Sequence, residues 1–326
     1  MTRDEIIALP KVELHLHLDC SMSFQSVKAL VPEMTPDRYR AQFLAPTKCK
    51  NLVDYFRYLG PPLALLQTPE ALRIQTIDLM RQLAADNVIY AEMRFAPHLH
   101  RQEGLATDRV VEIVLAAIDE AKSRYPVEAR LLVCTLRPDD TASGLDLVRI
   151  ADRYRDQGVG GLDLAGDEAG HSLAAHIPVF RKARDKGLNI TAHAGEAVGA
   201  TSVREVVEQL GTRRVGHGVR SIEDPAVVDL LREQNVHLEV CPSCNIQIDV
   251  FDRYEDHPVD RLRQLGVALS LNTDARGPTG LTLTDEYERM HQTFGWGAVE
   301  FRAANRDALA VAFISPEVRR TLLDQA

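Results

Sequence analysis

Histidines and a carboxylate stand close together near the start of the chain. Residues 10–24 read PKVELHLHLDCSMSF and contain His15, His17 and Asp19, spaced two positions apart. Side chains two apart on an extended strand point to the same face, so the three are expected to line one side of a strand. Imidazoles and carboxylates are the side chains that bind divalent transition metals and transfer protons.

More polar side chains follow other apolar stretches of the chain. They are Gly166, Asp167 and Glu168 in DLAGDE, His193 and Glu196 in TAHAGE, His217 in VGHGV, and Asp274 in SLNTD. A single buried histidine is commonly a core residue with a hydrogen-bond partner. Four histidines and an aspartate at the ends of predicted strands are much harder to explain by packing.

Three neutral imidazoles and one carboxylate suit a divalent metal, with zinc as the first choice and iron or manganese left open. A zinc-bound water has a pKa of about 7, which supplies hydroxide at neutral pH. Glu196 lies three residues after His193, past the end of the strand. It is therefore expected to face a substrate as a proton donor or acceptor.

The elements that must position these residues alternate between strands and helices. Eight short stretches rich in β-branched and apolar residues predict strands at 11–18, 88–95, 129–136, 158–166, 188–195, 214–219, 236–242 and 267–273. The segments between them carry apolar residues at three- and four-residue spacing, which predicts helices. Eight βα units favour an α/β fold, a (β/α)₈ TIM barrel formed by residues 1–326 as one domain. The alternative is an open doubly wound sheet, but no glycine-rich fingerprint follows the first strand.

In such a barrel the carboxyl ends of the strands converge on one face, where active sites are built. The segment between the first two predicted strands is far longer than one crossover helix requires. Its amphipathic patterns predict extra helices after strand 1 that cover the C-terminal face. Phe56 and Leu63 are expected to line an apolar pocket beneath them.

Composition excludes several classes of partner. The 326 residues carry a net charge of −9, which argues against nucleic acid and against anionic membranes. No apolar run is long enough to span a bilayer, and the N-terminus lacks the apolar core of a signal peptide. Five cysteines do not form a disulfide framework, so a reducing cytoplasm is expected. The expected partner is a small molecule, and the oligomeric state stays open.

The motifs PKVELHLHLD, DLAGDE, HAGE, VGHG, CPS-N and SLNTD occur in the order and spacing of the adenosine deaminase family, which the chain resembles from residue 10 to residue 274. The resemblance implies hydrolytic deamination of a 6-aminopurine nucleoside, converting adenosine or deoxyadenosine to inosine or deoxyinosine and ammonia. It also implies one zinc ion per chain, held by His15, His17, His193 and Asp274. The fourth predicted strand contains no lysine that could bridge a second metal.

The same resemblance implies a role for each remaining residue. Glu196 matches the group that protonates purine N1, and His217 matches the group that orients the attacking hydroxide. Asp274 would also accept a hydrogen bond from that hydroxide. The backbone N–H of Gly166 matches the donor to purine N3. Asp19 matches the residue that holds the ribose 5′-hydroxyl, and His17 is also expected to contact the substrate.

The sequence departs from the family pattern in two places. Cys20 stands where the family usually has glycine. Ala275 replaces a second aspartate that contacts purine N7, and Arg276 follows it. Arg276 is interpreted either as a cation at the rim of the pocket, suited to a phosphate or carboxylate, or as a surface arginine that caps a loop.

Cys241 and Cys244 form CPSC, which can be half of a zinc site or a redox pair; two ordinary cysteines near the pocket are the favoured interpretation.

Two other functions remain open. The lost aspartate allows the same chemistry on a modified 6-aminopurine nucleoside, such as aminodeoxyfutalosine or an N6-substituted adenosine. A non-catalytic barrel that binds nucleosides is the third hypothesis, but it would have no need of Glu196 beside a metal site. In the family that the chain resembles, adenine deaminases tend to have glutamate at position 19 and N6-methyl-AMP deaminases tend to have asparagine. The resemblance therefore implies that Asp19 favours a nucleoside with a free 5′-hydroxyl.

Overall fold

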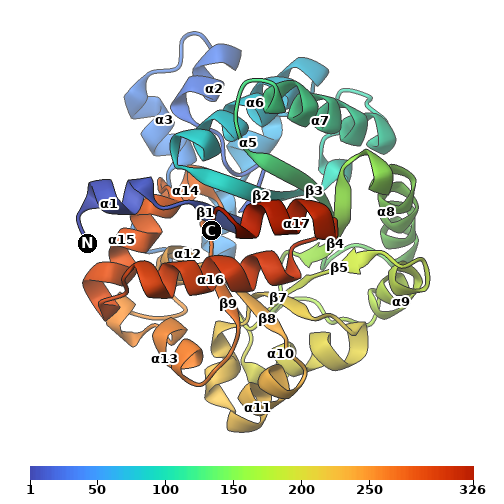
Figure 1. The fold of residues 1–326 in the computed structure, drawn as a ribbon. Helices are drawn as coiled ribbons and strands as arrows, with labels where there is room; N and C mark the ends of the chain where they lie inside the picture. Colours follow the sequence, from blue (N-terminus) through green and yellow to red (C-terminus); the bar gives the residue numbers. More distant parts are fainter.

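Parallel strands form the centre of the molecule, and helices surround them (Figure 1). The computed structural model describes residues 1–326. The strands are β1 (Lys11–His17), β2 (Val88–Phe95), β3 (Glu128–Leu136), β4 (Val159–Ala165), β5 (Asn189–Ile190), β6 (Ala192–Ala194), β7 (Arg214–His217), β8 (His237–Val240) and β9 (Leu269–Leu271). These agree with the predicted strands, except that the fifth is interrupted at Thr191 and forms β5 and β6.

The strands close into a barrel. Strands β1 to β5 and strands β6 to β9 pair in chain order, and every pair is parallel. The N–H of Thr191 donates to the carbonyl of Leu162, so the hydrogen bonds along β4 continue beyond the end of β5. On the other side, the N–H of His17 donates to the carbonyl of Asp274 at 2.7 Å, so the chain after β9 joins β1. The predicted (β/α)₈ barrel is confirmed.

The helices cover the barrel from outside and over both ends. They are α1 (Arg3–Ala8), α2 (Phe24–Leu30), α3 (Pro36–Phe43), α4 (Leu52–Tyr55), α5 (Gly60–Leu65), α6 (Pro69–Ala85), α7 (Thr107–Lys122), α8 (Thr141–Tyr154), α9 (Ile177–Asp185), α10 (Ala200–Glu205), α11 (Pro225–Glu233), α12 (Pro242–Gln247), α13 (Val259–Gln264), α14 (Arg276–Thr279), α15 (Leu283–Phe294), α16 (Ala298–Val311) and α17 (Pro316–Leu323). Helices α2 to α6 are the predicted insertion after strand 1. Helices α16 and α17 cross the opposite end of the barrel, where their side chains pack on Val12 and Leu14 (Figure 1).

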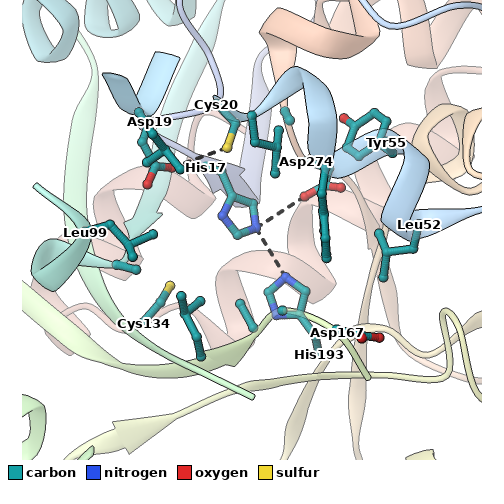
Figure 2. A pocket seen from close by; sticks show the side chains of 18 of the residues that line it. His17, Asp19, Cys20, Leu52, Tyr55, Leu99, Cys134, Asp167, His193 and Asp274 are labelled. Carbon is teal, nitrogen blue, oxygen red and sulfur yellow. Dashed lines mark hydrogen bonds and ion pairs between the residues drawn. The ribbon is translucent and has the colours of Figure 1, made fainter. Parts of the chain in front are cut away.

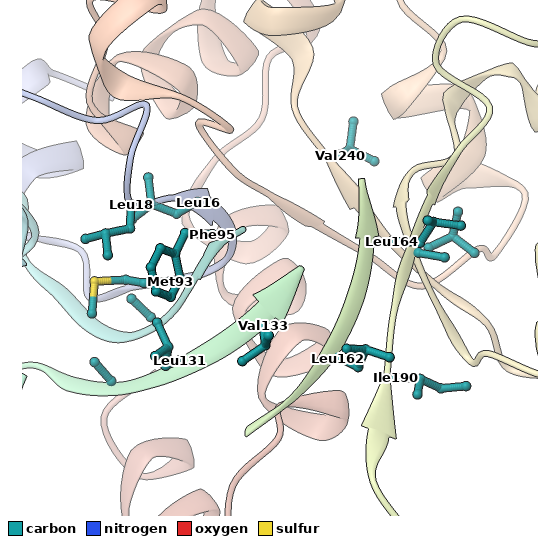
Figure 3. Packing of buried hydrophobic residues seen from close by; sticks show 14 of the residues in the cluster. Leu16, Leu18, Met93, Phe95, Leu131, Val133, Leu162, Leu164, Ile190 and Val240 are labelled. Carbon is teal, nitrogen blue, oxygen red and sulfur yellow. The ribbon is translucent and has the colours of Figure 1, made fainter. Parts of the chain in front are cut away.

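Strand alternation separates an apolar outer face from a polar interior. Leu16 lies between His15 and His17, and Met93 lies between Glu92 and Arg94. The two apolar side chains belong to the main buried cluster, which packs strands against helices (Figure 3). The polar residues therefore point into the barrel.

Fully buried charges fill this interior and neutralise one another. Arg94 lies 3.1 Å from Asp163 and 2.6 Å from Glu239. Arg214 lies 2.6 Å from Glu239 and 2.7 Å from Glu92. Buried charges are tolerated only when they are paired and hydrogen-bonded, so this network fixes the positions of its members. Two of them, Asp163 and Glu239, reach the functional site.

Candidate active site

Three histidines and one aspartate meet at the C-terminal end of the barrel. His15 and His17 come from β1, His193 comes from β6, and Asp274 follows β9. Their ligand atoms all lie within 4.8 Å of one another. Nε2 of His17 is 3.2 Å from Nε2 of His193 and 3.3 Å from Oδ1 of Asp274 (Figure 2). The structure thus brings together the four residues predicted as metal ligands.

The backbone around this cluster is held in specific conformations. Asn272 accepts hydrogen bonds from the N–H groups of Leu14 and His15 at 2.8 and 3.0 Å, which ties β1 to the end of β9. Asp274 and His217 have φ angles of 62° and 60°. Left-handed backbone is costly for residues other than glycine, and such strain is concentrated at functional sites.

The ring orientations fit a metal ion. Nδ1 of His15 lies 3.1 Å from Glu239, and Nδ1 of His193 lies 3.2 Å from Asp163. Each carboxylate accepts the Nδ1 proton and leaves Nε2 with a free lone pair, as in the usual carboxylate–histidine–metal arrangement. Nε2 of His15 is buried, and the only polar atom recorded against it is Oδ1 of Asp274, at 3.2 Å. A metal ion held by the four side chains would satisfy it.

Burial sets the protonation of the cluster. It lowers the pKa of His17 to about 4, so this ring is neutral at pH 7. Burial alone would raise the pKa of Asp274, but the hydrogen bond and charge of His15 hold it well below the usual range. Burial and the charge of Arg94 act to lower the pKa of His15. The bonds of His15 to Asp274 and Glu239 outweigh these two effects, so its pKa is raised above the usual value.

Glu196 and His217 lie beside one another. Nε2 of His217 is 3.4 Å from Oε1 of Glu196, and both are buried. Burial, together with the charges of Asp274 and Glu168, raises the pKa of Glu196 well above its usual value. Burial also lowers the pKa of His217 far below its usual value. The site therefore pairs a protonated carboxyl with a neutral imidazole.

The loop that carries Glu196 is held by a second carboxylate. Glu168 accepts hydrogen bonds from the backbone N–H groups of residues 195–198 at 2.7 to 3.1 Å, and from the hydroxyl of Ser202. All four N–H groups thus share one side-chain acceptor. Glu168 thereby fixes the direction in which Glu196 enters the site.

A cavity of about 440 Å³ opens above the metal-ligating cluster. Every predicted site residue lines it except His15, which lies behind the others. Phe56 and Leu63 from the inserted segment also line it, as predicted. Most of its wall is apolar and includes Leu99 and Leu136 (Figure 2). The chamber suits a flat heterocycle with polar groups at its edges.

Asp19 lies in the wall of the cavity, beyond the end of β1. It is 5% exposed, and its Oδ2 lies 3.4 Å from Nε2 of His100. Nδ1 of His100 faces the carbonyl of Leu66 at 2.8 Å. The ring of His100 therefore lies between Asp19 and the carbonyl of Leu66. Burial would raise the pKa of Asp19, but His100 lowers it, and Oδ1 receives only a long contact of 3.5 Å from the Cys20 thiol.

Gly166 follows β4 with a φ of 98°, a conformation that glycine adopts readily. Its N–H makes no hydrogen bond within the chain, and the residue lines the cavity. The N–H is therefore free to meet an acceptor on a ligand.

The interpretation of Arg276 is wrong in both of its forms. The side chain is neither at the rim nor at the surface; it is 5% exposed. Its Nη2 lies 2.6 Å from Glu13 and 3.1 Å from Asp86. These buried carboxylates explain why an arginine points away from the pocket, and neither can be read from the local sequence. Ala275 does line the cavity, with only a methyl group.

The CPSC cysteines are buried and free, as the favoured interpretation expected. Cys241 and Cys244 pack with Cys49, Leu52 and Tyr55 beside the pocket. They do not share a metal-binding group with each other.

Sequence reasoning missed three polar residues that build the site, and it named a fourth, Glu168, without its role. Asp163 and Glu239 orient metal-ligating histidines, Glu168 caps the Glu196 loop, and His100 contacts Asp19. A signal existed for the first two, because each is an acidic residue inside an otherwise apolar parallel strand. Parallel barrel strands are buried on both faces, so an isolated charge there requires a partner.

A sequence description of the adenosine deaminase family matches residues 10–326. The chain belongs to the adenosine deaminase family. Its members are hydrolytic deaminases. The adenosine deaminase of Clostridium acetobutylicum is 32% identical over 328 residues, covering 98% of this chain and 98% of that protein.

Solved structures share the fold over nearly the whole chain. Adenine deaminase from Arthrobacter aurescens is 25% identical with a TM-score of 0.88, covering 98% of each chain. An amidohydrolase from Burkholderia ambifaria with bound zinc is 22% identical with a TM-score of 0.88, covering 98% of this chain and 90% of that one. The family assignment and the geometry of the four side chains both indicate a metal cofactor. No helix in the structure is both long and apolar enough to cross a bilayer.

Proposed function

We propose that this chain hydrolytically deaminates a 6-aminopurine nucleoside, with adenosine and 2′-deoxyadenosine as first substrates and one zinc ion per chain. The observation that carries the proposal is the position of Glu196, which lies beside His217 and lines the same cavity as the metal-ligating cluster. Burial raises the pKa of its carboxyl, which favours the protonated form. A neutral carboxyl can protonate ring nitrogen N1 and make C6 electrophilic. The three possible metal groups all contain Asp274, which supports one centre rather than two.

The reaction adds water across the N1–C6 bond and then expels the amino group. A divalent metal held by His15, His17, His193 and Asp274 supplies an activated water at neutral pH. Glu196 donates its proton to N1 as the oxygen–C6 bond forms. The proton that the water releases passes through the side chains beside it to the amino nitrogen. The C6–N bond then breaks and ammonia leaves, the C6 hydroxyl returns a proton to Glu196, and the carbonyl of inosine remains.

Other residues orient the nucleoside. The free N–H of Gly166 serves as a donor to N3. Asp19, held by His100, accepts a hydrogen bond from the 5′-hydroxyl, and His17 lies at the same end of the cavity. A 5′-phosphate would place a second negative charge against Asp19, which disfavours a nucleotide substrate.

Ala275 supports a second candidate, deamination of a modified 6-aminopurine nucleoside such as aminodeoxyfutalosine or an N6-substituted adenosine. A methyl group at this position makes no polar contact with the ring, and the apolar wall has room for a larger group. A non-catalytic nucleoside-binding barrel is disfavoured because binding alone does not require a protonated Glu196 beside the His–Asp cluster.

The test is ammonia release by the zinc-loaded protein from adenosine, deoxyadenosine, adenine, AMP, N6-methyladenosine and aminodeoxyfutalosine. The proposal expects adenosine or deoxyadenosine to lead, with kcat/KM above about 10⁴ M⁻¹s⁻¹. Faster turnover of aminodeoxyfutalosine or N6-methyladenosine supports the second candidate. Faster turnover of adenine or AMP contradicts the role of Asp19.

A further inference from the structure

Arg276 is a buried cation two residues after the metal-ligating Asp274. It is the first residue of α14, and 5% of it is exposed. Its Nη2 donates to Oε2 of Glu13 at 2.6 Å and to Oδ2 of Asp86 at 3.1 Å. A buried ion pair adds little stability compared with apolar packing, but it holds its partners in one geometry.

Glu13 connects the two sides of Asp274. Its Oε2 binds Arg276, whereas its Oε1 accepts from the backbone N–H of Thr273 at 2.9 Å and also from the Thr273 hydroxyl. Thr273 directly precedes Asp274, and Arg276 follows Asp274 by two residues. One carboxylate therefore bridges the chain before and after the metal-ligating aspartate.

The backbone of this segment is also bound to the chain that carries two metal-ligating histidines. The N–H of Asp274 donates to the carbonyl of His15 at 3.0 Å, and the N–H of His17 donates to the carbonyl of Asp274 at 2.7 Å. The N–H of Arg276 donates to the hydroxyl of Ser21 at 3.2 Å, and this hydroxyl donates to the carbonyl of His17 at 2.6 Å. The path of the segment thus affects three of the four proposed ligands.

Asp274 needs this support because its backbone is strained. Its φ of 62° is left-handed, and such a conformation persists in a residue other than glycine only where the surrounding structure imposes it. Its Oδ1 lies 3.2 Å from Nε2 of His15 and 3.3 Å from Nε2 of His17. A metal site requires its ligands to stay within about 0.5 Å of their places, so a small shift of the Asp274 backbone would weaken it.

We propose that Arg276 is a positioning residue for the metal centre, because it anchors Glu13 and thereby holds Thr273 and Asp274 in the conformation that directs Oδ1 to the metal. The inference rests on the metal site of the proposed function and adds a residue that touches neither metal nor substrate. Without the guanidinium, the buried Glu13 carboxylate lacks its cation and has to move toward another donor. The Thr273 groups bound to it would move as well.

The experiment measures the zinc dissociation constant by competition with a chelator, in the absence of substrate. Loss of a supporting group beyond the ligands typically weakens metal binding about 10- to 100-fold, and we expect an effect of this size for Arg276→Met. Arg276→Lys keeps the positive charge and should recover most of the affinity. The matched control is Asp86→Asn, because Asp86 also binds Arg276 but otherwise accepts from the first two N–H groups of α15, at 2.7 and 3.1 Å. It should lower the free energy of unfolding and keep the zinc affinity of wild type.

Unchanged zinc affinity in a folded Arg276→Met variant would overturn the proposal. An equal loss of affinity in Asp86→Asn would also overturn it, because the effect would then follow from destabilisation in general. If Arg276→Met does not fold, Glu13→Gln takes its place, since the amide keeps an acceptor for Thr273 but has no charge to hold the guanidinium. We expect zinc binding about tenfold weaker in Glu13→Gln, and wild-type affinity would contradict the proposal.

Amide hydrogen exchange of the metal-free protein separates this inference from the proposed function. The N–H of Asp274 should exchange about tenfold faster in Arg276→Met than in wild type, and at the wild-type rate in Asp86→Asn. If wild type binds no zinc, the proposed function fails, and faster exchange in Arg276→Met would still support the role of Arg276 in holding the segment. Equal exchange in wild type and Arg276→Met would overturn it.

Discussion

Nε2 of His217 lies 3.4 Å from Oε1 of Glu196, and a chain of hydrogen bonds fixes which of them donates. The backbone N–H of Val259 donates to Nδ1 of His257, so Nε2 of that ring donates to the amide oxygen of Asn245. The amide nitrogen of Asn245 then donates to Nδ1 of His217. The proton of His217 therefore sits on Nε2, the ring nitrogen on the side of Glu196. The second oxygen of Glu196 is left to carry the carboxyl proton toward a substrate.

Replacing Glu196 with glutamine should remove proton donation and preserve the shape of the site. We expect kcat to fall by about 10² to 10⁴, the usual contribution of a positioned acid or base. Zinc content, measured by atomic absorption, should stay at the wild-type value because Glu196 is not one of the four proposed ligands. A variant that keeps more than about a tenth of wild-type kcat would show that another group protonates the ring.

Replacing Asp163 with asparagine should weaken the metal site without touching a ligand. The carboxylate lies 3.2 Å from Nδ1 of His193 and 3.1 Å from Arg94. Loss of such a partner typically costs about 10- to 100-fold in metal affinity. Competition with a chelator measures the zinc dissociation constant. Asp146→Asn is the matched control, because that carboxylate pairs with Arg149 at the surface; equal affinities in both variants would contradict the prediction.

The barrel could be predicted because strands and helices alternate in the sequence, and each strand carries a local apolar signature. The metal-ligating residues could be placed for a related reason. His15 and His17 share a strand face, and the C-terminal ends of all the parallel strands lie at the same end of the barrel.

What could not be predicted depends on contacts between segments far apart in the chain. Arg276 is paired with Glu13 and Asp86, and nothing near position 276 in the sequence indicates that two buried carboxylates lie next to it in the fold. Long-range pairing of polar groups is a property of the folded chain.

Replacing Glu168 with alanine should displace Glu196 and destabilise the loop. Four backbone N–H groups of residues 195–198 and the Ser202 hydroxyl would lose their acceptor. We expect a loss of about 1 to 3 kcal/mol in the free energy of unfolding. The misplaced acid should also lower kcat by about 10²-fold. Asp140→Asn is the control, because Asp140 accepts from the N–H of Ser143 at the start of α8 and does not line the cavity.

Urea unfolding and initial rates measure these two effects. Because Glu168 does not contact the metal-ligating atoms, zinc affinity should change little. Unchanged kcat in a folded Glu168→Ala variant would show that the turn keeps its shape without the carboxylate.

A buried carboxyl outside the site makes stability depend on pH. Glu286 in α15 is fully buried; Oε1 accepts from the N–H of Ser243 at 3.1 Å, and Oε2 has no partner. Burial raises the pKa of Glu286 from 4.5 to about 7. The folded state therefore binds this proton more tightly than the unfolded state between these two pH values. Its contribution to stability is fully present below pH 4.5 and is lost as the pH rises to about 7.

Replacing Glu286 with glutamine should remove this dependence, because the amide keeps an acceptor for Ser243 and never ionises. The free energy of unfolding of Glu286→Gln minus that of wild type should increase by about 3 kcal/mol between pH 4.5 and pH 8. Urea unfolding at both pH values measures the difference, and taking it between two proteins cancels all other titrations. Glu255→Gln is the matched control, since Glu255 is exposed and should show no change. A difference that is constant with pH would mean that folding does not raise the pKa of Glu286.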